Sequence, residues 1–211
     1  MVKYNVFQVV HPKDVPSSKK LINFAWEMKK KPNGTYRARL ALRGFKQKEH
    51  TDYRPNDKSA PVVSETTIKI GLALVILWNL YASLTDCSAA FLHGYYQRPK
   101  EQIYTEVPRG FEKWYPPWCV LLCLKTIYGG IQSGLQWWRE ICKVIYYLKW
   151  KRHEVDPCLF VKWKNNRLIL FLVWVDDALM IGNKADVLEE TKRFRSLFNS
   201  TDEAPGGNLI E

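Results

Sequence analysis

An unbroken apolar run followed by two adjacent aspartates constrains the fold of this chain more than any other feature. Residues 168–175 read Leu-Ile-Leu-Phe-Leu-Val-Trp-Val, and Asp176 and Asp177 follow directly. A strand without polar residues at alternate positions is typical of a strand buried on both of its faces. The sequence therefore predicts a buried strand over 168–175 with two carboxylates at its end.

Two neighbouring carboxylates at the end of a buried strand need a compensating partner. Burial of an unpaired carboxylate is costly, and adjacent like charges repel each other. An ordinary hairpin turn is one interpretation, but such turns favour Asp-Gly or Asn-Gly, whereas Ala178 follows Asp177 here. A hard divalent cation such as Mg²⁺ would resolve the conflict, because it prefers oxygen ligands. Asp86 ends another short apolar strand, so aspartates from two neighbouring strands fit two-metal phosphoryl transfer.

The positive charge is concentrated in the first third of the chain. The formal net charge is +11, and positions 1–70 hold 15 basic against 6 acidic residues. Asn33-Gly34 predicts a hairpin, and the alternating pattern after it places Arg37, Arg39 and Arg43 on one face of a strand. A solvated charged face is the alternative, but the absence of acids between positions 29 and 48 makes phosphate binding at least as well supported.

Composition excludes several other classes of protein. The 211 residues are 46% hydrophobic, which is enough for one sizeable core in one domain with two lobes. The longest apolar stretch, 70–78, is too short for a membrane span, and the N-terminus lacks the apolar core of a signal peptide. We therefore expect no membrane partner and no secretion. Five scattered cysteines favour free thiols in a reducing compartment; a zinc site would combine Cys119 and Cys123 with Cys142, His153 or Cys158, but paired spacing is lacking.

Periodicity and turn signals predict an α+β chain. Helices are expected over 66–79 with Ser64 as N-cap, over 132–148, and in a last segment capped by Asp186. Strands are expected over 21–31, 36–43, 80–85, 103–107, 120–124, 159–163, 167–175 and 178–181.

Six segments, in order along the chain, match the motifs of a single protein family. The segment from Thr85 to Gly94 reads Thr-Asp-Cys-Ser-Ala-Ala-Phe-Leu-His-Gly, and the segment from Trp174 to Gly182 reads Trp-Val-Asp-Asp-Ala-Leu-Met-Ile-Gly. The other four are 36–47, 60–63 with 66–68, 107–111 and 124–129. Together they resemble the reverse transcriptases of copia-type (Pseudoviridae-like) LTR retrotransposons. In that family the first two segments usually contain Asp-Val-Lys-Asn-Ala-Phe-Leu-His-Gly and Tyr-Val-Asp-Asp-Met-Leu-Ile-Thr-Gly.

The resemblance implies the fingers and palm of an RNA-directed DNA polymerase. The implied α+β fold has an antiparallel palm sheet with helices packed on one face. Residues 1–80 would form a basic fingers-like region with a β-hairpin and a following helix, and 81–200 the palm. Residues 201–211 would be a truncated tail, with thumb and RNase H absent. We therefore expect a fragment or relic of a retrotransposon polyprotein, located inside the cell in cytoplasmic particles or in the nucleus.

The resemblance also assigns roles to individual residues. It implies that Asp86, Asp176 and Asp177 are catalytic and bind two Mg²⁺ ions, for which Mn²⁺ can substitute. An aromatic residue at the position of Phe91 would exclude a 2′-hydroxyl and so select deoxynucleotides. Gln132 would lie against the nucleotide, and the implied contacts of Arg37, Arg39 and Arg43 are the triphosphate or the template backbone. The implied partners are an RNA or DNA template with its primer, and deoxynucleoside triphosphates.

Departures from the family pattern keep other functions open. After Gln132 the family usually has Ala-Pro-Arg, whereas this chain has Ser133, Gly134 and Leu135, so a frequent basic residue is replaced. A non-catalytic nucleic-acid-binding module derived from the same fold is the main alternative. A two-metal nuclease ranks last, because such enzymes usually need more than three acidic ligands.

Overall fold

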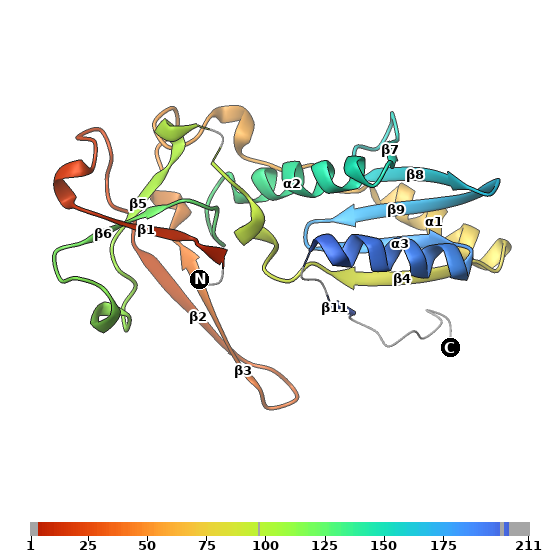
Figure 1. Cartoon of the computed structure of the whole chain (residues 1–211), viewed down its shortest axis with the longest axis horizontal. Helices are drawn as coiled ribbons and strands as arrows, with labels where there is room; N and C mark the ends of the chain where they lie inside the picture. The colour runs from red at the N-terminus through yellow and green to blue at the C-terminus, as the bar shows by residue number, and fades with distance from the viewer. Residues whose placement is uncertain (1–3, 97, 199–200, 203–211) are drawn as a thin grey trace. The chain divides into compact units, whose positions relative to one another are not determined.

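The chain forms two compact units, and each is built from two separate segments. The computed structural model describes residues 4–96, 98–198 and 201–202 (Figure 1). The first unit combines residues 1–60 with 91–137, and the second combines 61–90 with 138–211. This division differs from the expected border between 80 and 81. Residues 61–80 belong to the second unit, because their helix packs on its sheet. Residues 91–137 belong to the first, because one of their strands pairs with the N-terminal strand and a second strand pairs with that one.

The second unit contains a six-stranded sheet of order β11-β4-β10-β9-β8-β7, in which every neighbouring pair is antiparallel (Figure 1). Its strands are β4 (Tyr81–Asp86), β7 (Lys151–Arg152), β8 (Leu159–Lys164), β9 (Arg167–Trp174), β10 (Asp177–Gly182) and β11 (Thr201–Asp202). Strand β9 lies inside the sheet, with Ile169 and Phe171 fully buried and Leu172 and Val173 nearly so. Leu168 and Leu170 are half-buried, and Trp174 is 49% exposed. The prediction of a strand buried on both faces is therefore confirmed for the middle of β9.

Helices cover both faces of this sheet. Val75 of α1 (Glu65–Leu77) packs with Leu172 and Ile181 on one face. Phe171, which points the opposite way from Leu172, packs edge-on against Phe194 of α3 (Lys184–Leu197). The end of α2 (Ser133–Tyr147) lies on the same face as α3, because Tyr146 contacts Phe160, the cross-strand partner of Phe171. The helices expected in the palm, α2 and α3, thus share one face, and α1 covers the other.

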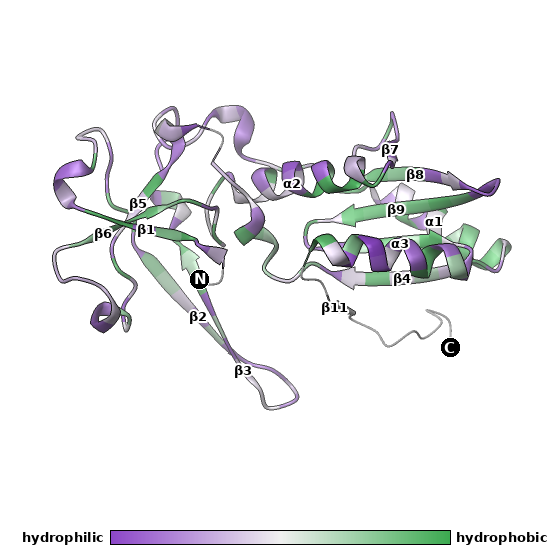
Figure 2. Cartoon of the chain, in the orientation of Figure 1, coloured by the Kyte–Doolittle hydropathy of each residue, from purple (hydrophilic) through white to green (hydrophobic). Residues whose placement is uncertain are grey.

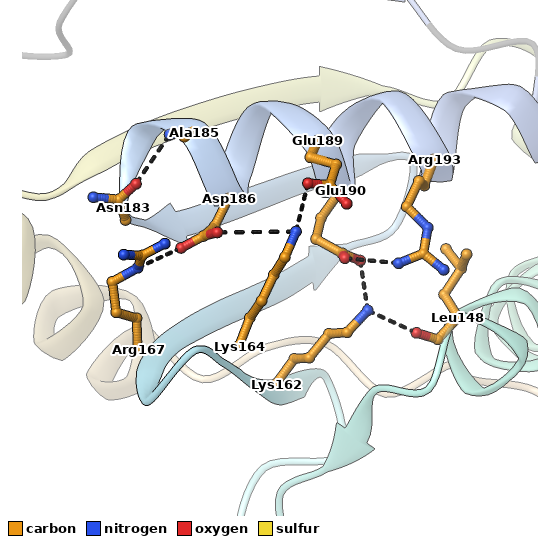
Figure 3. Close-up of polar contacts among 10 residues, drawn as sticks. All are labelled: Leu148, Lys162, Lys164, Arg167, Asn183, Ala185, Asp186, Glu189, Glu190 and Arg193. Atoms are coloured by element: carbon orange, nitrogen blue, oxygen red, sulfur yellow. Dashed lines mark hydrogen bonds and ion pairs between the residues drawn. The ribbon is translucent and has the colours of Figure 1, made fainter.

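Ion pairs fasten α3 to the β8–β9 hairpin (Figure 3). Lys162 Nζ lies 2.8 Å from Glu190 Oε2 and donates to the Leu148 carbonyl at 2.9 Å. The Glu190 side chain is completely buried and also accepts a hydrogen bond from Arg193. Closer to the start of α3, Arg167 Nε lies 2.7 Å from Asp186 Oδ2. Each buried carboxylate therefore has a cation beside it, which offsets the cost of its burial.

The start of α3 differs from the prediction. Asn183, rather than Asp186, is the N-cap, and its side-chain oxygen accepts from the backbone N–H of Ala185 (Figure 3). Asp186 lies in the first helical turn and is buried against Arg167. The hydrogen bond from Arg167 holds the pKa of Asp186 below its ordinary value. Asn and Asp are about equally good N-caps, so the sequence alone did not discriminate between them.

The first unit contains a three-stranded sheet and a separate hairpin. The sheet has the order β1-β6-β5 and is formed by β1 (Phe7–Val10), β5 (Ile103–Thr105) and β6 (Val120–Cys123). The hairpin pairs β2 (Phe24–Lys30) with β3 (Tyr36–Leu42). Short 3₁₀ helices elsewhere in the chain are η2 (Pro12–Asp14), η3 (Gly44–Lys46), η4 (Pro55–Asp57), η5 (Ala90–His93), η6 (Pro99–Glu101) and η7 (Glu112–Trp114).

Burial changes along the hairpin from its base to its tip. Leu40 and Leu42 at the base of β3 are buried, whereas Tyr36 at the tip is 80% exposed. Met28 on β2 is 69% exposed. Figure 2, which colours residues by hydropathy, shows polar as well as apolar residues along this hairpin. Only the base of the hairpin therefore contributes to the core of the first unit.

Two further properties of the described residues bear on the predicted class. None of their helices combines the length and the apolar character needed to cross a bilayer. All five cysteines are free and buried. Burial raises the pKa of Cys123 and Cys142 to about 12 and that of Cys158 to about 11.

Candidate active site

The sheet register of the second unit brings the predicted aspartates to one end of the sheet. Asp177 is the first residue of β10, and its direct cross-strand partner is Asp86, the last residue of β4. Directly opposed residues of an antiparallel pair have Cβ atoms about 4.5–5.5 Å apart on the same face. Asp176 immediately precedes Asp177 in the two-residue turn that joins β9 to β10. The expected meeting of strand-end aspartates from neighbouring strands is therefore present in the backbone.

The turn that carries Asp176 has an unusual backbone. Val175 has a φ of 54°, a value that β-branched residues rarely adopt. The Asp176 carbonyl accepts a hydrogen bond of 2.7 Å from the backbone N–H of Cys87. Because Cys87 follows Asp86, this bond ties the turn directly to the end of β4. A strained turn held by surrounding structure is common where side chains must be placed for function.

The Cys87 side chain reports the electrostatic field at this end of the sheet. Its thiol is 2% exposed, and burial raises its pKa to about 12, with the negative charges of Asp86, Asp176 and Asp177 adding to the effect. The three carboxylates thus act on the pKa of this thiol in the same direction as its burial.

The three carboxylates match the donor chemistry of Mg²⁺, which takes oxygen ligands. Within the part of the chain that the structure describes, however, no group of three or more His, Cys, Asp or Glu side chains stands arranged to hold a metal ion. The backbone thus brings the three residues to one end of the sheet. The assignment of Asp86, Asp176 and Asp177 as metal ligands stays a prediction.

Two of the predicted nucleotide-binding residues lie around one tyrosine in the first unit. The half-buried Phe91 ring packs edge-on against the Tyr128 ring, with centroids 4.6 Å apart. The guanidinium carbon of Arg39 lies 5.1 Å from the centre of the Tyr128 ring. Phe91 and Arg39 are therefore both in contact with Tyr128, a residue to which the sequence assigned no role. Two signals for Tyr128 were available: it lies in the similar segment 124–129, and the Gly129-Gly130 break follows it directly.

The other two hairpin arginines differ from Arg39 in their surroundings. Arg37 and Arg43 are exposed, and Arg37 pairs across the hairpin with Lys29. Arg37 is thus accessible on β3 and Arg43 is accessible just beyond the end of that strand, whereas Arg39 is half-buried against Tyr128. Contact with phosphate stays a prediction for all three arginines.

Gln132 forms hydrogen bonds that join separate segments of the first unit. Its side chain is 2% exposed, accepts a 2.8 Å hydrogen bond from Gln47 Nε2 and donates a 2.9 Å bond to the Asp52 carbonyl. Gln47 in turn accepts from the backbone N–H of Ile131. Both ends of the Gln132 amide are therefore engaged within the unit, and its predicted contact with a nucleotide is untested.

Residues 4–205 match the family described as reverse transcriptase (RNA-dependent DNA polymerase). The chain belongs to this reverse transcriptase family. It is 31% identical over 204 residues to the Retrovirus-related Pol polyprotein from transposon TNT 1-94 of Nicotiana tabacum, covering 93% of this chain and 15% of that protein. It is 29% identical over 181 residues to the corresponding polyprotein from transposon RE2 of Arabidopsis thaliana, covering 83% of this chain and 12% of that protein. The resemblance to copia-type reverse transcriptases is confirmed.

Solved structures give a weaker likeness for this reverse transcriptase chain. One is the foamy viral protease-reverse transcriptase in complex with ds DNA, with a TM-score of 0.43 and 12% identity over 95% of this chain and 29% of that one. Another is the native prototype foamy virus protease-reverse transcriptase, with a TM-score of 0.36 and 12% identity over 83% of this chain and 19% of that one. The predicted α+β class with an antiparallel sheet is confirmed by the elements themselves.

Proposed function

We propose that this chain supplies the polymerase portion of a retrotransposon Pol polyprotein and extends a primer on an RNA template by two-Mg²⁺ nucleotidyl transfer. The observation that carries the proposal is the register of β4 and β10, which sets Asp86 opposite Asp177 beside the Asp176 turn. Family membership supports the reaction class. Because the chain spans 15% or less of the polyproteins it matches, their complete activities are not transferred to it.

In this proposal the carboxylates of Asp86, Asp176 and Asp177 hold the two cations. The cations would supply a lowered pKa at the primer hydroxyl and stabilise charge on the leaving oxygen. The rigid sheet fixes where the carboxylates lie, because β4, β10 and β9 are hydrogen-bonded neighbours. The bond from Cys87 to the Asp176 carbonyl keeps the turn in register with β4.

Residues of the first unit would bind the substrates. The exposed guanidinium groups of Arg37 and Arg43 are suited to the phosphates of a template or a nucleoside triphosphate. The ring of Phe91 would stand against the sugar and reject a 2′-hydroxyl. Gln132 would act by holding the segment around Asp52 in place, given that both ends of its amide are occupied.

The departure at Leu135 bears on whether the chain is active or a relic. Leu135 is 8% exposed, so an apolar side chain is packed into the interior where the family often has a basic residue. If that residue contacts a phosphate, its loss would lower the rate by about 10-fold or more, since such a contact contributes about 1.5–3 kcal/mol. A slow but Mg²⁺-dependent polymerase is therefore the expected form.

A primer-extension assay on the purified chain tests the proposal. Wild-type protein is given a DNA primer on an RNA template, deoxynucleotides and Mg²⁺, and is compared with Asp176→Asn. The exposed Asp14→Asn is the matched control. We expect Asp176→Asn to lower incorporation by about 100-fold or more, and Asp14→Asn to leave it unchanged. Equal incorporation by wild type and Asp176→Asn would disprove the assignment.

The exposed basic residues of the hairpin also fit a second candidate, a nucleic-acid-binding module without catalysis. In that case binding to RNA would be salt-sensitive, independent of Mg²⁺, and unaffected by loss of the three aspartates. Replacing Arg37 by Ala should then lower the slope of log affinity against log salt by about 0.7–0.9. Binding of this kind without Mg²⁺-dependent incorporation would favour the binding module over the polymerase.

A further inference from the structure

Tyr128 is anchored more firmly than an ordinary loop residue. Its carbonyl accepts a 2.7 Å hydrogen bond from the backbone N–H of Leu42, at the end of β3. The next residue, Gly129, has a φ of 81°, and a Cβ there would lie 2.2 Å from the Leu42 carbonyl oxygen. The backbone around Tyr128 is thus pressed against the strand that carries Arg39.

The ring of Tyr128 connects this strand to Phe91. One side of the connection is the Arg39 guanidinium at 5.1 Å from the ring centre. The other is the edge-on contact with the Phe91 ring at 4.6 Å between centroids. Edge-on aromatic packing fixes the angle between two rings as well as their distance.

The backbone of Phe91 is fixed independently of its ring. The Phe91 carbonyl accepts hydrogen bonds from Thr126 Oγ1 at 2.6 Å and from the Gly94 N–H at 3.1 Å. With the main chain held, the remaining freedom of Phe91 is the rotation of its side chain. Tyr128 is an aromatic neighbour that limits this rotation.

We propose that Tyr128 is a positioning residue that fixes the ring of Phe91 against the β3 strand and thereby sets how strongly the enzyme discriminates deoxyribonucleotides from ribonucleotides. The inference rests on the proposed function, because it deepens the role given to Phe91. Tyr128 acts through Phe91 and does not touch the sugar itself. Its ring is the property required, so Tyr128→Phe should preserve discrimination and Tyr128→Leu should weaken it.

Single-nucleotide incorporation measures this effect. The ratio of kcat/KM for dATP to that for ATP is determined for wild type, Tyr128→Phe, Tyr128→Leu and Phe91→Val, with the exposed Tyr147→Leu as control. We expect Tyr128→Leu to lower the ratio about 3- to 10-fold, the size of an aromatic contact, and Phe91→Val to lower it further. Tyr128→Phe and Tyr147→Leu should retain the wild-type ratio.

The double variant Phe91→Val/Tyr128→Leu separates positioning from general damage. If Tyr128 acts through Phe91, the double variant has the same ratio as Phe91→Val alone. A further fall in the double variant, or an equal loss of dATP and ATP incorporation by Tyr128→Leu with an unchanged ratio, would overturn the inference.

Failure of the proposed function gives a different result. In that case wild-type incorporation is absent or is unchanged by Asp176→Asn. The same ratio is then measured as affinities for dATP and ATP, by tryptophan fluorescence with a terminated primer–template in Ca²⁺. A wild-type preference for dATP that Tyr128→Leu reduces supports the inference without catalysis, and equal affinities in wild type overturn it.

Discussion

Strands β3 and β9 are both members of antiparallel hairpins, yet their surroundings differ. β9 is flanked by strands on both edges and covered on both faces, so four successive side chains from Phe171 to Trp174 include only one that is exposed. β3 has a single partner strand and is exposed over its first three residues. The comparison teaches that β9 is held in place by neighbouring strands and helices. This support allows the strand to end in a strained turn with charged residues. The hairpin depends on its base and leaves cationic side chains accessible.

The largest effect that tests this comparison is expected at Phe171. Its buried ring contacts Trp150 and Phe194, so Phe171→Ala should lower the free energy of unfolding by about 3–5 kcal/mol. Tyr36→Ala at the exposed hairpin tip should change it by about 0.5 kcal/mol or less. Urea denaturation followed by tryptophan fluorescence checks both variants. Similar losses for the two would contradict the comparison.

A similar contrast within α3 involves two adjacent glutamates. Glu190 is completely buried between Lys162 and Arg193, whereas the side chain of Glu189 is 57% exposed beside Lys164 (Figure 3). Glu190→Ala would leave Lys162 with an unpaired charge and should cost about 3 kcal/mol, within the range for breaking a buried pair. Glu189→Ala should cost at most about 1 kcal/mol. Chemical denaturation of both variants measures the difference.

In the first unit, close packing of the backbone is tested at a glycine. Gly129→Ala combines an unfavourable positive φ with a clash at the Leu42 carbonyl, and we expect a loss of about 2–3 kcal/mol. Gly110 has a φ of 89°, but a Cβ added there would meet nothing within 4 Å, so Gly110→Ala should cost only about 1 kcal/mol. Thermal unfolding of the two variants measures how much the close approach of Gly129 to the Leu42 carbonyl adds to the loss of stability. Equal losses for the two variants would show that the backbone at Gly129 shifts and removes the clash.

The smallest effect concerns pH and Asp156, which joins the start of α1 to the loop before β8. Burial pushes the pKa of Asp156 upward, but hydrogen bonds from Thr67, Ser64 and Cys158 outweigh it and leave the pKa below its ordinary value of 3.8. The stabilisation is therefore present above about pH 4 and is lost as pH falls through the lower folded-state pKa. Asp156→Asn should cost about 1–2 kcal/mol at pH 7, and this difference should narrow below pH 4. Urea denaturation of both proteins across this pH range measures the change.

Elements with a strong local pattern were predicted well. The apolar run of β9, the Ser64 cap of α1 and the helical spacing of α2 all lie within a few residues of their predicted bounds. The face of α3 formed by Val187, Thr191, Phe194 and Phe198 is buried as expected. These features depend on residues that are close together in the sequence, so the local pattern of residue types is enough to predict them.

Features that depend on distant partners were missed. Strand β1 is short and half exposed, and it exists because Phe7–Val10 pairs with β6, more than a hundred residues later. The contact of Tyr128 with Phe91 joins a turn to the 3₁₀ helix η5, and no periodicity in the sequence connects the two. At the candidate site the sequence indicated that strand-end aspartates would be neighbours, but the pairing of Asp86 with Asp177 required the sheet.

The burial of every native cysteine makes this chain a convenient subject for site-specific labelling. The thiols of Cys87, Cys123 and Cys142 have pKa values raised to about 12, so they stay protonated and unreactive toward alkylating dyes near neutral pH. A cysteine introduced at the exposed Asn33, or at the exposed Lys192, would then react almost alone. A pair of such labels would give a spectroscopic distance between the two units in the free chain and with a primer–template.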